Sequence, residues 1–158
     1  MKYLLDLSII NNSPRNYRTK PIIKGELFPN FIAKTINKRI IELSRQRGKI
    51  VILRFELEAN SFRFKKQEIK QIDNLINKIN NKNEKVKAII FFASNELDIK
   101  QGFDLQNSNF EIISNGYNFQ EKFSITRFPT TIVIDKNGKL IDYYNYMDEI
   151  NLTHLINE

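Results

Sequence analysis

Two almost uninterrupted apolar runs, with an amphipathic segment between them, constrain the fold of this chain more than any other feature. The runs are residues 49–55, Lys-Ile-Val-Ile-Leu-Arg-Phe, and residues 86–93, Val-Lys-Ala-Ile-Ile-Phe-Phe-Ala. Such runs are typical of strands that are covered on both faces, as in parallel sheets. Between them, apolar side chains recur every three or four positions, which predicts a helix with one buried face. These side chains are Phe62, Ile69, Ile72, Leu75, Ile76 and Ile79. The sequence therefore predicts a strand–helix–strand unit and an α/β sheet.

Two predicted hairpins flank this unit. Residues 31–36 and 39–44 are short apolar segments separated by Asn37-Lys38, which predicts an N-terminal hairpin. Residues 130–135 and 139–144 are predicted strands joined through Asn137-Gly138, the strongest short hairpin signal. This second hairpin adds an antiparallel edge, so the predicted sheet is mixed.

The remaining elements are shorter. We expect a short helix within 95–109, a strand at 110–114, a helical turn or two at 118–123, and a last helix capped by Asp148. Seven apolar residues are predicted to form the core between sheet and helices: Ile52, Phe55, Ile72, Ile89, Phe91, Ile132 and Ile134.

The length and charge suggest one domain with a basic end. The 158 residues are the usual size of a single domain, which we place at 25–158, after a basic N-terminal arm at 1–24. Residues 1–49 hold 11 Lys and Arg but 3 Asp and Glu, whereas the remainder is close to neutral. A basic end can meet an anionic surface or can simply be solvated. RNA-binding signatures are missing, so we do not expect nucleic acid as a partner.

The composition also excludes several chemistries. The chain has no cysteine and a single histidine, His154. Disulfides, thiolate metal sites, thiol nucleophiles and His-rich metal centres are therefore excluded, and we predict no metal site and no cofactor. Ser61 with His154 as base, or Glu56 with Glu58 as a carboxylate pair, are conceivable catalytic groups. No third partner for such a pair is evident, so we expect Ser61 to be a helix cap, and we expect both glutamates to be solvated acids just past a strand end.

Three stretches resemble the thioredoxin-like fold, and in particular the bacterial thiol–disulfide oxidoreductases of the TlpA/redoxin type. They are Gly25-Glu-Leu-Phe-Pro-Asn-Phe31, the strand segment from Gly48 to Phe55, and Phe128-Pro-Thr-Thr-Ile-Val-Ile-Asp-Lys-Asn-Gly-Lys-Leu140. The resemblance spans about residues 25–158. It implies a thioredoxin-like mixed sheet flanked by helices, with the N-terminal hairpin as an extension, and a cis peptide bond before Pro129.

The chain departs from that family at the redox motif. In the family, a Trp-Cys-x-x-Cys motif follows the first central strand. Here, counting from the strand places Asn60 and Arg63 at the cysteine positions, and counting back from the helix places Ser61 and Phe64 there. Because no thiol exists in either register, the resemblance implies a redox-inactive member with no catalytic residue.

The favoured function is therefore a non-catalytic binding or accessory module. In the family, backbone beside the cis-proline pairs with an extended peptide, and this strand addition needs no thiol. We expect a protein or extended-peptide partner to occupy the former substrate groove. The candidate peptide-binding residues are Asn60, Ser61, Phe62, Arg63, Phe128 and Pro129. A partner-binding patch at Tyr143, Tyr144 and Tyr146 stays open beside simple packing of these rings.

Two other functions stay open. One is thiol–disulfide oxidoreductase or antioxidant activity, which the resemblance alone suggests and the absence of cysteine opposes. The other is a basic adaptor for an anionic surface, acting through residues 1–49. The resemblance suggests an extracytoplasmic, periplasmic location. The first ten residues do not form a signal peptide pattern, because Asp6 interrupts the apolar run, and no stretch is long enough to span a membrane. The oligomeric state is left open.

Overall fold

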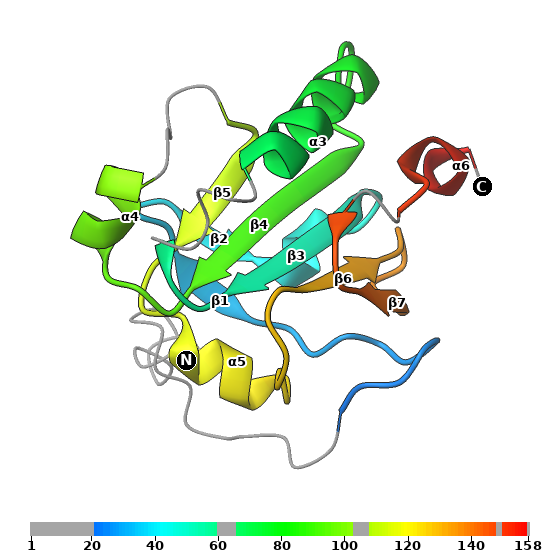
Figure 1. The fold of residues 1–158 in the computed structure, drawn as a ribbon. Helices are drawn as coiled ribbons and strands as arrows, with labels where there is room; N and C mark the ends of the chain where they lie inside the picture. The colour runs from blue at the N-terminus through cyan, green and yellow to red at the C-terminus, as the bar shows by residue number, and fades with distance from the viewer. Residues whose placement is uncertain (1–20, 60–65, 103–107, 148–149, 158) are drawn as a thin grey trace.

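A computed structural model describes residues 21–59, 66–102, 108–147 and 150–157 (Figure 1). Its centre is a five-stranded mixed sheet with the strand order β5-β4-β3-β6-β7. The strands are β3 (Ile50–Glu56), β4 (Val86–Phe92), β5 (Phe110–Ile113), β6 (Thr130–Ile134) and β7 (Leu140–Tyr144). The pairs β3–β4 and β4–β5 are parallel, whereas β3–β6 and β6–β7 are antiparallel. The predicted mixed α/β sheet is confirmed.

The helices cover both faces of this sheet. They are α3 (Lys66–Ile79), α4 (Glu96–Gly102), α5 (Tyr117–Lys122) and α6 (Leu152–Ile156), and a short 3-10 helix, η2, spans Leu43–Gln46. Side chains of α3, α4 and α6 pack on one face, and those of α5 pack on the other (Figure 1). None of the helices in the described segments is long and apolar enough to cross a membrane.

The predicted N-terminal hairpin forms a separate two-stranded sheet of β1 (Ile32–Lys34) and β2 (Ile40–Glu42). It packs on the α5 side, because Phe31, Ala33 and Ile41 join the same apolar cluster as Phe119 of α5 and Phe123, which directly follows that helix. The chain before it is irregular but attached to the sheet. The backbone N–H of Gly25 donates to Leu140 O, and that of Phe28 to Gly138 O.

All seven predicted core residues are buried. The structure divides them between two clusters, because successive side chains of a strand point to opposite faces. Ile52 and Ile72 lie on the α3 side, and the other five lie on the α5 side. The α5 side also holds a group of packed rings: Phe28, Phe31, Phe55, Phe91, Phe119 and Phe123.

Details at the helices differ from the sequence-based expectations. Asp148, the expected cap of the last helix, lies outside the described residues, and the side chain of Asn151 caps α6 by accepting from the His154 N–H. Asp73 of α3 is buried, and its Oδ1 accepts a hydrogen bond from the Asn109 N–H at 2.8 Å. Burial raises the pKa of the Asp73 carboxyl above its ordinary value, although the bonds from Asn109 oppose this shift.

Candidate functional site

The C-terminal end of β3 and the start of β6 meet at the point where the order of strands in the sheet reverses. From β3 the chain proceeds outward through β4 to β5, and then returns to add β6 and β7 on the opposite side. Phe55 of β3 is paired in register with Thr130 of β6. In open α/β sheets, crevices that bind ligands form outside the strand ends at such a reversal. The topology therefore marks this end of the sheet, next to Phe128 and Pro129, as the first place to look for a site.

The backbone of Phe128 extends past both neighbouring strands. The β3–β6 ladder reaches only to Thr130, and the β6–β7 ladder ends at the pair Thr131–Tyr144. Pro129 has no N–H to continue a ladder, and the Phe128–Pro129 peptide bond is cis. Neither the N–H nor the C=O of Phe128 has a hydrogen-bond partner within the described part of the chain. The carbonyl of the preceding residue, Arg127, does have a partner, since it accepts a hydrogen bond from Thr130 Oγ1 at 2.6 Å.

Two hollows adjoin this backbone and share Arg127 and Asn145 in their walls. The first has a volume of about 410 Å³ and is lined by residues 127–129 together with Asn145 and Tyr146. The second has a volume of about 390 Å³ and is lined by Pro21, residues 124–127, Thr130 and residues 143–145. We refer to the two together as the Pro129 groove. Its walls offer exposed aromatic surface and a polar rim beside the unpaired backbone of Phe128.

A buried ionic cluster lies beneath one wall of the Pro129 groove. Arg54 is 0% exposed on β3, and its side chain points to the same face as Ile50 and Ile52. Its Nε donates to Glu56 Oε2 at 2.7 Å, and its Nη1 and Nη2 donate to the two carboxylate oxygens of Glu68 at 2.8 and 3.0 Å. Burial disfavours the charged guanidinium, yet the bonds and charges of Glu68 and Glu56 hold the Arg54 pKa above its ordinary value. Arg54 therefore stays charged and ties β3 to α3.

The wall above this cluster is formed by Asn145 and Tyr146, and the cluster holds that segment in place. The Arg54 guanidinium carbon lies 5.9 Å from the centre of the Tyr146 ring, within the range of a cation–π contact. Glu68 Oε2 also accepts a hydrogen bond from the backbone N–H of Met147. Tyr146 keeps 44% of its surface exposed despite this anchoring. The buried cluster therefore holds the wall at Asn145 and Tyr146 in place, while the outer surface of Tyr146 stays exposed to solvent.

The sequence-predicted site residues are only partly visible in the structure. Asn60, Ser61, Phe62 and Arg63 lie outside the described residues, so their approach to Phe128 stays a prediction. Pro129 is buried and Phe128 is half-buried, and both line the Pro129 groove. The Phe128 ring also packs against the apolar cluster on the α5 side. Substituting this ring would thus disturb the core as well as any bound partner.

The expectation that Glu56 is a solvated acid is wrong. Glu56 is 1% exposed and is bonded to Arg54, whereas Glu58 is exposed and lines a different hollow with Asn95 and Asp98. The two glutamates therefore do not form a catalytic pair. Their separation follows from the end of β3: Glu56 is the last residue of the strand and is buried, whereas the chain has left the sheet before Glu58.

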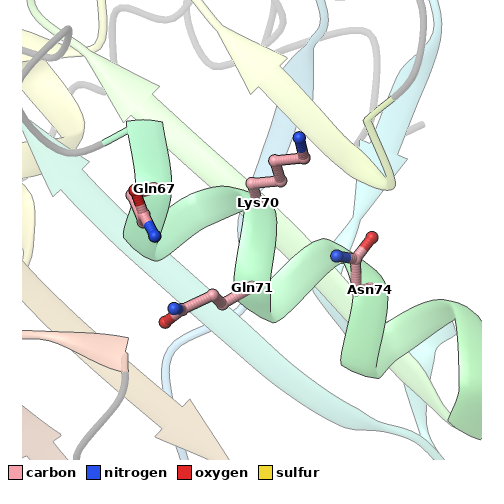
Figure 2. Close-up of a pocket in the computed structure, with 4 residues that line it drawn as sticks. All are labelled: Gln67, Lys70, Gln71 and Asn74. Atoms are coloured by element: carbon pink, nitrogen blue, oxygen red, sulfur yellow. The ribbon is translucent and has the colours of Figure 1, made fainter.

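A further hollow lies over the outer face of α3 and is lined by Gln67, Lys70, Gln71 and Asn74 (Figure 2). Figure 2 shows these side chains extending from one helix, with the strands of the sheet behind it. No side chain from another described element converges on them. This arrangement is that of a solvated helix face, and it adds nothing to the Pro129 groove.

The described part of the basic end is largely neutralised by ion pairs. Five of its cations lie within ion-pair distance of carboxylates: Lys24 with Asp142, Lys38 with Glu96, Arg39 with Glu111, Arg45 with Glu42 and Lys49 with Glu84. The sequence-level charge excess therefore does not become an open cationic face over residues 21–49.

Comparison with known proteins places the chain in a family. The profile of the AhpC/TSA family matches residues 24–143, and the chain belongs to this family. A search of curated proteins finds no match.

Solved structures share the fold. A Chlorobium tepidum protein assigned as the thiol:disulfide interchange protein DsbE superposes with a TM-score of 0.67 at 17% identity, over 86% of this chain and 96% of that one. The thioredoxin domain of a thiol-disulfide oxidoreductase from Bacteroides vulgatus gives 0.65 at 17% identity, over 84% and 96%. The exposed lipoprotein thioredoxin of Streptococcus pneumoniae gives 0.61 at 20% identity, over 82% and 98%. The predicted thioredoxin-like fold, with redoxin family membership and without cysteine, is confirmed.

Proposed function

We propose that this thioredoxin-like chain is a non-catalytic binding module that holds an extended polypeptide segment in the Pro129 groove. The observation that carries the proposal is the backbone of Phe128, whose N–H and C=O have no described partner and adjoin a groove with an exposed aromatic wall. A segment that pairs with Phe128 would satisfy both groups at once, as in strand addition at a short edge. This interaction depends on backbone and shape, so the loss of the dithiol leaves it intact.

Thiol–disulfide exchange is not supported by these residues. Exchange proceeds through a mixed disulfide that a thiolate must form, and the 158 residues contain no cysteine. We expect the protein to reduce insulin disulfides in the presence of dithiothreitol no faster than a heat-inactivated sample, with a dithiol thioredoxin as positive control. Turnover above the heat-inactivated sample would contradict this expectation.

An adaptor role of the basic end is less supported than the groove, because five of its described cations already pair with carboxylates. We therefore place the partner at the groove and propose that it is a protein rather than a nucleic acid or a lipid surface. Asn60, Ser61, Phe62 and Arg63 are proposed to complete the site from the segment that follows β3. A site of action outside the cytoplasm is part of the same proposal, supported by the family resemblance and by the exposed lipoprotein among the structural neighbours.

The proposal is tested with modified peptides, since Phe128 also packs into the core. Random linear octapeptides displayed on phage are selected on the immobilised protein, and the best binder is synthesised with each backbone nitrogen methylated in turn. We expect one position to lose about tenfold or more in affinity, because methylation there leaves a backbone acceptor of the groove unpaired. The adjacent positions serve as matched controls and should lose less. Failure to select any peptide, or equal tolerance of methylation at every position, would contradict backbone pairing.

A further inference from the structure

Among the described residues that line the Pro129 groove, the only charge is positive. None of the described residues that line either hollow is Asp or Glu. The charged residue among them is Arg127, which lines both hollows. Asp142, which directly precedes the groove residues Tyr143, Tyr144 and Asn145, is paired with Lys24 at 2.9 Å. Within the described segments, therefore, nothing anionic at the groove competes for the Arg127 guanidinium.

Arg127 differs in this respect from most of the other arginines in the described segments. Arg39, Arg45 and Arg54 each pair with a carboxylate. Arg127 is exposed and has no carboxylate partner in the part of the chain that the structure describes, and the same holds for Arg47. A guanidinium presents a planar fork of donors that matches a carboxylate, so an unpaired one beside a groove favours an anionic ligand group.

Arg127 places its positive charge next to the unpaired backbone of Phe128. It directly precedes Phe128, and its own carbonyl is held by Thr130 Oγ1. Across the groove, the Tyr146 ring makes a cation–π contact with the buried Arg54, and part of the Tyr146 side chain stays exposed. A segment paired with Phe128 would present alternate side chains to the same side, about 6.8 Å apart. One such side chain lies within reach of the Arg127 fork, while its neighbours contact the aromatic wall.

We infer that the Pro129 groove selects extended polypeptide segments with a carboxylate side chain, Asp or Glu, at one fixed position, where it pairs with Arg127. This inference rests on the proposed function and adds to it the chemical class of the partner. The selectivity comes from a short-range contact at the groove and not from the overall positive charge of the chain.

The test repeats the phage selection of random linear octapeptides at 150 mM salt, where charges more than about 8 Å apart are largely screened. It compares the wild-type protein with Arg127→Gln and with Arg47→Gln, which removes the same charge at an exposed site outside the groove. We expect Asp or Glu to be enriched at one position on the wild type and on Arg47→Gln, and not on Arg127→Gln. For the best peptide, replacing its acidic residue by the amide should weaken binding to the wild type by about five- to tenfold and leave binding to Arg127→Gln unchanged.

The outcomes separate the inference from the proposed function. Selection of peptides without an acidic position would overturn the inference and leave the binding function standing. Acidic enrichment that survives in Arg127→Gln, or that is lost equally in Arg47→Gln, would overturn it as well. No enrichment of any peptide would overturn the proposed function itself. Arg127→Lys is an additional variant that keeps the charge but loses the planar fork. We expect its enrichment of Asp or Glu to lie between those of the wild type and Arg127→Gln.

Discussion

Replacing Arg54 by Met is expected to lower the free energy of unfolding by about 3–5 kcal/mol, because it leaves two buried or nearly buried carboxylates without their cation. Glu56 is 1% exposed and would lose the guanidinium that now donates to it at 2.7 Å. Glu68 would lose two hydrogen bonds from the same group. The measurement is urea denaturation followed by circular dichroism, with comparison of midpoints at constant slope.

Two further variants make the Arg54 result interpretable. Arg45→Met removes an arginine whose side chain is 81% exposed and pairs with Glu42 at 3.5 Å, and it should cost less than about 0.5 kcal/mol. The double variant Arg54→Met with Glu56→Leu should recover part of the lost free energy of unfolding, because it also removes the Glu56 carboxylate, the more deeply buried of the two that lose their cation. The described cluster would be contradicted if Arg54→Met and Arg45→Met lowered the free energy of unfolding equally. It would also be contradicted if the double variant were less stable than Arg54→Met alone.

Truncating Phe91 to Ala is expected to destabilise the fold by about 3–5 kcal/mol, through lost apolar burial and the cavity that remains. Its ring is fully buried and stacks on Phe55 at a centroid distance of 4.8 Å. It also meets the rings of Phe31 and Phe119 at 5.5 and 5.4 Å, so the hairpin, the sheet and α5 all depend on it.

The matched control for Phe91 is Tyr117→Ala on α5. Tyr117 is 57% exposed, so its truncation should cost within about 1 kcal/mol, as for most surface positions. Both variants are compared by thermal and urea unfolding. A cost below about 1 kcal/mol for Phe91→Ala would show that the α5 side of the sheet is not packed as described.

The fold was predictable because its main signals are local. The strands β3 and β4 are almost wholly apolar, and Gly138 in the β6–β7 turn has a positive φ of 85° that a glycine adopts without strain. The hairpin β1–β2 also follows from its own residues. The burial of Ile22 and Phe28 did not, because a segment rich in Pro and Gly carries no signal for the distant surface on which it packs.

The candidate site was less predictable, since its charges depend on partners far apart in the chain. Arg54 meets Glu68 on α3 and Thr131 on β6, which are 14 and 77 positions away. A signal was nevertheless present: Arg54 stands inside an apolar run, on the same strand face as Ile52, so a buried carboxylate partner was required. The unpaired backbone of Phe128 and the role proposed for Arg127 become visible only once the ends of β3 and β7 are located against β6.

The most direct test of the account is whether a bound segment pairs with the backbone of Phe128. The measurement is a titration of the ¹⁵N-labelled protein with the selected octapeptide at 150 mM salt, followed by amide chemical shifts and hydrogen exchange. The account predicts that the Phe128 amide shifts and becomes protected from exchange, with smaller shifts at Arg127, Asn145 and Tyr146. An unchanged Phe128 amide, with shifts confined to the basic residues of segment 1–49, would contradict the groove and favour the anionic-surface alternative.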